Sequence, residues 1–240
     1  MIPAAVKSDP DDLKPERDPS TLLVNWTDFR QLIDYESVRT ARDDEPLCLA
    51  IIDLDRFADV AQHLGPGGVK QVLKVMGPLL RAHFGAKCML GYQPLDTFGV
   101  LLADTSVEEA VLSLDVLRRR FETNTLGPSE SESVLPDPDS FAVALTLSAG
   151  LAVHPRDGKD AQTLIRSAKM ALLEAKRAGR NRVQLAVTRK MVLKSSYFPR
   201  PQLEALAHLA RVTGQAESEL LREALDLLFD RVEVQLKSKE

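Results

Sequence analysis

The segment MLGYQPLDTFGVLLA, residues 89–103, constrains the fold more than any other part of the chain. Apolar residues dominate at about residues 88–92 and again at 98–102, and a short polar stretch separates the two runs. Two apolar runs of this length joined by a few turn-forming residues are typical of a β-hairpin. We therefore predict two short strands with a tight turn between them.

A second apolar segment predicts a strand that brings acidic residues to the same place. Residues 47–53 read LCLAIID, and the acidic pair Asp53 and Asp55 ends the segment. If this strand packs beside the hairpin, Asp53 and Asp96 lie together where the strand ends meet the turn. Two carboxylates that close can hold Mg²⁺ and a phosphate group, because hard cations prefer oxygen ligands. Strand ends also carry many structural acids, so the residues alone leave both interpretations open.

Composition indicates an ordinary soluble protein with room for one large and one small domain in 240 residues. Charged residues make up 28% and apolar residues 44% of the chain. The formal charge is −4 and no polybasic run occurs, so the composition gives no indication of nucleic-acid binding. Cys48 and Cys88 fall in predicted buried strands, which fits reduced thiols rather than a disulfide framework. Since no apolar leader and no run of about 18 apolar residues occurs, we predict a cytoplasmic protein without a membrane partner.

Helical and strand patterns alternate over about 170 residues, which is typical of an α/β fold with layered helices. We expect helices at about 20–40, 56–63, 69–84 and 107–122 and from Asp160 to Gly179, and strands at about 141–153 and 183–187. The run Gly65-Pro66-Gly67-Gly68 is expected to separate the second helix from the third. Asp160 is placed to cap its helix and Gly179 to end it.

Two segments lack such patterns. Residues 1–17 are rich in proline and charge and are predicted to be a disordered or weakly docked arm. Residues 123–140, TNTLGPSESESVLPDPDS, form a polar loop that is long for a compact domain. Loops of this length are usually functional or disordered, and we favour a flexible, disordered loop here.

The segment from about residue 18 to 187 carries three motifs in order: DPSTLLVNWTDF, DLDRFA, and SAGLAVHPRDG followed by AKMALLEAKRAGRNRV. This segment resembles the GGDEF family, the diguanylate cyclase domain that condenses two GTP into cyclic di-GMP. The resemblance implies a GGDEF or nucleotidyl-cyclase-like central sheet with flanking helices. The matching positions are Asp18, Thr21, Leu23, Asn25, Phe29, Asp53, Asp55, Phe57, Ser148, Gly150, Ala152, Pro155, Asp157, Gly158, Ala171, Leu172, Ala175, Lys176, Gly179, Arg180, Asn181 and Val183.

The signature that gives this family its name is altered. Its five positions read Pro94-Leu95-Asp96-Thr97-Phe98 in this chain. Paired glycines let the backbone turn tightly and let guanine and phosphate come close, because they carry no side chain. Pro94 fixes φ and has no N–H, Leu95 adds bulk, and Thr97 replaces the family's glutamate.

Other positions to which the resemblance assigns a nucleotide contact are altered too. The family's phosphate-contacting lysine aligns with Ala58, and its guanine-reading asparagine and aspartate align with Ala61 and Lys70. Each guanine hydrogen bond left unmade costs about 1–3 kcal/mol. The family's inhibitory R-x-x-D site aligns with Gly85-Ala86-Lys87-Cys88. The resemblance, with these departures, implies no diguanylate cyclase activity, no catalytic residue, no metal site and no cofactor.

Four charged residues of the family's site remain: Asp53, Asp96, Lys176 and Arg180. One interpretation is residual nucleotide binding, with cyclic di-GMP or GTP as ligand, in which the two acids and the two bases form a metal pair and a phosphate pair. The other is an inherited fold whose remaining charges pair with one another or with water. We favour the second interpretation.

Residues 188–240 form a separate predicted unit. A short strand at 190–198 precedes Pro199, and helices at 202–212 and 216–234 flank a Thr-Gly turn. About 50 residues with this much leucine cannot build their own core, so an obligate homodimer is expected. The order of elements resembles the ribbon-helix-helix family, whose paired strands enter the DNA major groove. The resemblance implies DNA contacts by the strand, with Lys190, Lys194, Ser195 and Tyr197 as candidates.

Other features of this unit oppose a DNA-binding interpretation. The turn Gln215-Ala216-Glu217 lacks the basic or hydroxyl residues that would clamp a phosphate. From Thr188 onward the sequence has nine Lys and Arg and eight Asp and Glu, which gives a net charge of only +1. The release of counterions from DNA would therefore contribute little free energy to binding. If Phe198 points inward, Lys190 and Lys194 lie on the face opposite Tyr197, and a shift of one residue reverses this.

Two functions therefore remain from the sequence. The first is a non-catalytic regulatory protein in which a degenerate GGDEF domain is coupled to a dimeric DNA-binding module, as in a transcriptional regulator. The second is a non-enzymatic dimeric scaffold of a bacterial signalling or polarity pathway, with a partner protein on the GGDEF-like domain.

Overall fold

The computed structural model describes residues 15–43, 45–85, 88–123, 145–187 and 196–213 and parts of 216–232. The chain divides into two units, Met1–Thr188 and Arg189–Glu240. The first unit contains the sheet and the helices around it, and the second contains the helical C-terminal region. Each unit is described by itself.

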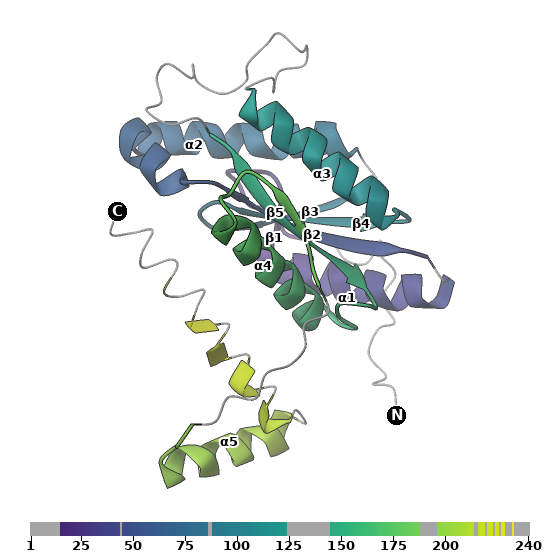
Figure 1. Cartoon of the computed structure of the whole chain (residues 1–240), viewed down its shortest axis with the longest axis vertical. Coiled ribbons are helices and arrows are strands. Elements are labelled where there is room, and N and C mark those ends of the chain that lie inside the picture. The colour runs from purple at the N-terminus through teal and green to yellow at the C-terminus, as the bar shows by residue number, and fades with distance from the viewer. Residues whose placement is uncertain are drawn as a thin grey trace. The chain divides into compact units, whose positions relative to one another are not determined.

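A six-stranded mixed sheet forms the centre of the first unit, with the order β1-β3-β4-β2-β5-β6 (Figure 1). The strands are β1 (Val24–Asn25), β2 (Leu47–Leu54), β3 (Met89–Gln93), β4 (Thr97–Ala103), β5 (Leu147–His154) and β6 (Val183–Leu185). Strand β2 is antiparallel to both neighbours, β4 and β5, and all eight of its residues are buried. The predicted hairpin is confirmed as β3 and β4, which pair directly across the turn Pro94–Asp96.

Helices cover both faces of this sheet. They are α1 (Trp26–Asp43), α2 (Phe57–Phe84), α3 (Val107–Glu122) and α4 (Ala161–Arg177). Figure 1 shows α2 and α3 on one face and α1 and α4 on the other. The predicted α/β class with layered helices is therefore confirmed, and β2 reads as a continuous apolar run because both of its faces are covered.

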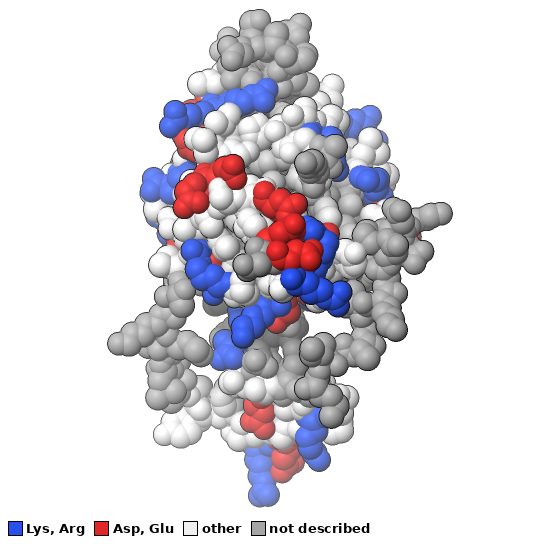
Figure 2. All heavy atoms as spheres, turned by 90° about the vertical axis from the view of Figure 1, so that its right-hand side faces the viewer, with Lys and Arg blue, Asp and Glu red and all other residues white. Residues whose placement is uncertain are grey.

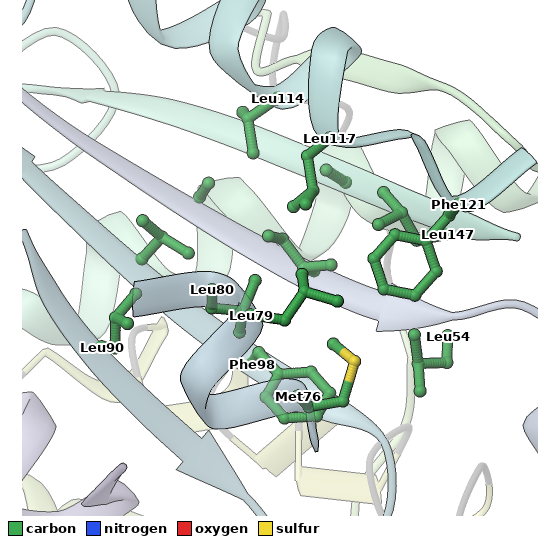
Figure 3. Packing of buried hydrophobic residues seen from close by; sticks show 14 of the residues in the cluster. Leu54, Met76, Leu79, Leu80, Leu90, Phe98, Leu114, Leu117, Phe121 and Leu147 are labelled. Atoms are coloured by element: carbon green, nitrogen blue, oxygen red, sulfur yellow. The ribbon is translucent and has the colours of Figure 1, made fainter. Parts of the chain in front are cut away.

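Apolar side chains fill the layer between the sheet and helices α2 and α3 (Figure 3). Leu79 and Leu80 from α2 and Leu114 and Leu117 from α3 point toward strand residues of the sheet. On the opposite face the fully buried ring of Phe29 lies against two glycines. A Cβ atom at Gly91 or Gly99 would lie 2.3 or 2.2 Å from that ring, so α1 can approach the hairpin only over glycine.

The first helix begins later than predicted, at Trp26 rather than near residue 20. The Asp18 carboxylate accepts hydrogen bonds from the backbone N–H groups of Ser20 and Thr21 and thereby holds a turn. Leu22 follows in the left-handed region with φ 60°. Asn25 then accepts the backbone N–H of Asp28 and caps the helix. Polar side chains that form hydrogen bonds with the nearby backbone compete with helix formation, and here these bonds keep residues 20–25 out of the helix.

Residues just before Asp18 are ordered. The backbone N–H of Glu16 donates to the Asp28 carboxylate over 2.7 Å, and the Glu16 carbonyl accepts the N–H of Asn25 over 2.8 Å. Arg17 forms an isolated bridge with Val24. The ordered part of the unit therefore includes part of the predicted arm, whose residues 1–14 lie outside the described chain.

The predicted break at the glycine-proline run is confirmed. Gly65 has non-helical dihedral angles, φ 64° and ψ −179°, and the kink at this residue separates two helical stretches within α2. Strand β5 begins at Leu147, with residues 145 and 146 outside it, and β6 ends at Leu185 rather than at 187. Residues 141–144, and 124–140 of the predicted loop, lie outside the described chain.

The predicted ends of the fourth helix are confirmed. Asp160 accepts the backbone N–H of Thr163 over 2.8 Å in a capping box. Gly179 adopts φ 112° just after the C-cap Ala178, where a residue with a side chain would be strained.

The second unit contains helix α5 (Arg200–Thr213), as predicted, and helical backbone at most described positions between residues 217 and 232. No residue of α5 is buried. Residues 196–199 are not in a strand, and the rest of the predicted strand lies outside the described chain. Within the described part of the chain, the structure contains no helix long and apolar enough to span a membrane.

Candidate nucleotide site at the strand ends

The hairpin turn and the end of β2 lie next to each other. Asp53 is paired with Thr97, and the backbone N–H of Leu54 donates to the Asp96 carbonyl over 3.3 Å. Asp53 and Asp96 are both buried, with 3% and 2% of their surface exposed. The structure thus brings the two predicted acids to one end of the sheet.

Each of the two carboxylates has a titratable neighbour. Asp53 forms an ion pair with Lys176 of α4, with 2.9 Å between carboxylate oxygen and ammonium nitrogen. Burial raises the pKa of Tyr92, and the charges of Asp18 and Asp96 raise it further, whereas the hydrogen bond from Leu95 lowers it. The charge of Asp96 thus lies close enough to Tyr92 to act on its hydroxyl. Among the described residues no group of three or more His, Cys, Asp or Glu is placed to hold a metal ion.

The Asp53–Lys176 pair is almost closed to solvent. Only 5% of the Asp53 side chain and 15% of the Lys176 side chain are exposed. At this separation and burial each group offsets much of the other's desolvation cost. The ammonium thus lies at the carboxylate that the sequence indicated as a metal ligand.

Arg180, the fourth predicted site residue, lies apart from these acids. It follows Gly179 in the loop between α4 and β6, where it adopts φ 63°, and its side chain is exposed. Its backbone N–H donates to the Ala175 carbonyl over 3.0 Å. Within the described chain it forms no ion pair with Asp53 or Asp96, so the structure unites Lys176, but not Arg180, with the acids.

Asp55 has a structural role that the sequence did not reveal. Its buried carboxylate accepts hydrogen bonds from Thr146 (2.8 Å), Ser148 (2.8 Å) and the backbone N–H of Asn181 (3.0 Å). The Asn181 side chain in turn bonds to Arg118 of α3. Asp55 therefore fixes the loop that carries Arg180. The sequence signals were its spacing of two from Asp53 and its match to the family motif in DLDRFA.

The hairpin turn has a backbone conformation that is typical of glycine, although no glycine occupies it. Leu95 adopts φ 97°, a left-handed conformation that is costly for a residue with a side chain, and its side chain is 45% exposed. Its N–H donates to the Tyr92 hydroxyl over 3.3 Å. Next to the turn, the side-chain oxygen of Gln93 is buried and has no hydrogen-bond partner in the described chain.

Replacing Leu95 by glycine is expected to stabilise the first unit by about 0.5–1 kcal/mol. The removed strain outweighs the extra backbone entropy that glycine gives the unfolded chain. The same change at Leu112, which is 65% exposed on α3, should instead destabilise by about 1 kcal/mol. Urea unfolding of both variants measures the difference, and a destabilised Leu95→Gly protein would contradict the strain.

The predicted DNA-contacting residues are mostly outside the described chain. Lys190, Lys194 and Ser195 fall there, whereas Tyr197 is described and fully exposed. Its contacts with DNA stay a prediction.

The model of the family described as "Diguanylate cyclase, GGDEF domain" matches residues 16–182. The chain belongs to the GGDEF family. Among curated relatives, diguanylate cyclase DosC of Escherichia coli is 28% identical over 168 residues, which cover 69% of this chain and 34% of DosC. The chain thus spans about a third of that relative's length.

Solved GGDEF structures have the same fold. The GGDEF domain of TpbB (also YfiN) from Pseudomonas aeruginosa superposes with a TM-score of 0.63 at 25% identity and covers 72% of this chain and 95% of that one. Diguanylate cyclase SiaD from the same organism, solved in complex with its activator SiaC, gives a TM-score of 0.59 at 26% identity. That match covers 71% of this chain and 61% of SiaD. The predicted GGDEF-like sheet with flanking helices is confirmed.

Proposed function

We propose that the GGDEF domain of this chain is non-catalytic and serves a regulatory protein as an interaction domain. The observation that carries this proposal is the pairing of Asp53 with Thr97, which stands where the family signature has a second carboxylate. The buried Asp53–Lys176 ion pair adds to it, although both of its residues match the family. A divalent cation at Asp53 would have to displace a buried ammonium 2.9 Å away. Thr97, paired with Asp53 across the sheet, offers a hydroxyl where the family signature has a carboxylate.

The turn supports the same proposal. Pro94 has no N–H to donate, and the Leu95 side chain occupies space that paired glycines leave open. The resemblance also places Ala58, Ala61 and Lys70 at positions of phosphate and guanine contact. Each change removes a different contact, so restoring the signature alone does not restore the site.

We expect the triple variant Pro94→Gly, Leu95→Gly, Thr97→Glu to form no cyclic di-GMP from GTP with Mg²⁺ or Mn²⁺. The guanine contacts stay absent, and Lys176 still neutralises Asp53. Chromatography of the nucleotides after incubation measures the product, with DosC as the positive control. Product from the triple variant would contradict the account, because it would trace the lost activity to the turn alone.

The C-terminal unit is proposed to join two copies of the chain. Helix α5 buries none of its residues, and Leu203 and Leu209, which lie toward the same side of the helix, are 45% and 50% exposed. Apolar helix faces of this kind are stable in water when a second copy covers them. Sedimentation equilibrium should give a dimer, and replacing Leu203 and Leu209 by glutamate should give monomers.

We further propose that this dimer binds DNA and that the protein acts as a transcriptional regulator. The order of strand, proline, helix, Thr-Gly turn and helix supports this proposal. Lys190, Lys194, Ser195 and Tyr197 are the proposed contacts, of which two per copy carry charge.

Replacing Lys190 and Lys194 by alanine should weaken DNA binding and lower the salt slope of log K by about 3 to 4, since the dimer loses four charged contacts. The same change at Lys237 and Lys239 is the matched control. Fluorescence anisotropy of a labelled duplex at several salt concentrations gives both values. An unchanged slope in the first variant would contradict the assigned contacts.

A dimeric protein scaffold is the second candidate. Figure 2 shows acidic and basic side chains interspersed on one face of the molecule, without a large region of one sign. The solved complex of SiaD with its activator SiaC is a precedent for a protein partner of a cyclase in this family. Dimerisation without any salt-dependent DNA binding would favour the scaffold over the regulator.

A further inference from the structure

A cavity of about 440 Å³ opens at the edge of the sheet, between the start of α1 and the hairpin turn. Its walls include three acidic residues, Glu16, Asp18 and Asp28, and two aromatic rings, Trp26 and Tyr92. Pockets that bind small groups have volumes in this range and combine apolar walls with a few fixed polar atoms. The cavity therefore has the size and lining of a binding site.

The carboxylates of Asp18 and Asp28 are each held by hydrogen bonds to one of their two oxygens. One oxygen of Asp18 accepts hydrogen bonds from Ser20 and Thr21, and one oxygen of Asp28 accepts from Glu16 and Asn25. The second oxygen of each accepts no hydrogen bond within the described chain. Burial raises the pKa of Asp18, but the hydrogen bonds from Ser20 and Thr21 outweigh it, so the pKa lies below its ordinary value.

The nearby guanidinium of Arg17 is bound to a backbone carbonyl. The guanidinium of Arg17, between the two acids Glu16 and Asp18 in the sequence, donates to the Leu22 carbonyl over 3.0 Å. Among the described residues, three acids and no base line the cavity. These acids give it a negative potential, which favours a cation over a nucleotide or another phosphate as ligand.

The aromatic walls narrow the choice of cation. Trp26 is partly exposed, with its ring centroid 5.5 Å from that of Phe29, and Tyr92 is buried below the turn. A guanidinium group is planar, stacks on aromatic rings and gives hydrogen bonds to two carboxylates at once, whereas an ammonium is a strongly hydrated point charge. The lining therefore suits arginine better than lysine.

We propose that this cavity binds an arginine side chain of a partner protein. Free arginine is a poorer ligand, because its own carboxylate meets the acidic rim, whereas an arginine within a peptide has none. Strand β4 lies between Tyr92 on β3 and Asp53 on β2. The proposed site is thus separate from the Asp53–Lys176 pair, and the inference does not depend on whether the GGDEF domain converts GTP.

Trp26 is the only tryptophan of the chain and so reports directly on the cavity. We would titrate the full chain with the blocked tripeptide acetyl-Gly-Arg-Gly-amide and follow tryptophan fluorescence. A saturable change is expected, with weaker binding of free arginine and of the lysine tripeptide and no change with the alanine tripeptide. The absence of a saturable change, or equal changes with arginine and alanine, would overturn the proposal.

Two charge-reversal variants test the location. Glu16→Lys should weaken tripeptide binding at least about five-fold, since it replaces an attractive charge by a repulsive one at the rim. Glu108→Lys, at an exposed position on α3, makes the same change in net charge and should alter affinity less than about two-fold. Equal affinities of the two variants would place the binding elsewhere and contradict the assignment.

Discussion

Replacing Lys176 by methionine is expected to destabilise the GGDEF domain by about 3 kcal/mol. Asp53 and Lys176 are 2.9 Å apart, and only 5% and 15% of their side chains are exposed. Breaking a buried pair leaves the remaining charge in a region of low dielectric constant, which costs about 3–5 kcal/mol. We expect the lower end of this range because the lysine end of the pair retains some contact with solvent.

A double variant separates this electrostatic cost from lost packing. With Asp53→Asn added, no uncompensated charge remains, so more than half of the lost stability should return. Urea unfolding followed by circular dichroism gives both free energies, and the single change Arg177→Met, at an exposed position of the same helix, measures the effect of removing an ordinary surface cation. If Lys176→Met were as stable as the starting protein, the ion pair would contribute nothing and the proposed obstacle to a metal ion would lose its basis.

Replacing Asp55 by alanine is expected to cost a similar amount, about 3 kcal/mol. Its buried carboxylate accepts hydrogen bonds from Thr146, Ser148 and the backbone N–H of Asn181. Without the carboxylate, three donors lose their acceptor in a buried region, and each such loss costs about 1–3 kcal/mol. Relaxation and water entry recover part of that sum.

Thr146→Val is the matched control, because it removes one of these donors and leaves the acceptor with the other two. It should cost about 1 kcal/mol. Asp55→Ala should also loosen the loop at Asn181, which hydrogen exchange of that segment would report. Equal stability of the two variants would show that Asp55 does not act as the centre of this network.

The strand and hairpin pattern could be predicted because both features are local. Alternation, run length and turn residues identified β3, β4 and β2, and antiparallel pairing then fixed Asp53 opposite Thr97. The sequence also singled out Asp53 and Lys176. It could not show that the two form a pair, because they lie far apart in the chain and meet only through the packing of α4 on β2.

Local polar contacts explain the predictions that were wrong. The Asp18 turn and the Asn25 cap delay the start of α1, although the preceding residues are compatible with a helix. Asp55 was grouped with Asp53 by spacing, and only the three-dimensional positions of its partners reveal its different role.

The most direct test of the central claim is to incubate the unaltered protein with GTP and Mg²⁺ or Mn²⁺ and to quantify cyclic di-GMP by chromatography, with DosC as the positive control. We predict no product above a heat-denatured sample at any protein concentration. Product that increases with protein concentration and disappears in the Asp53→Asn variant would show that the Asp53–Lys176 pair opens to form a working site, and would contradict the account.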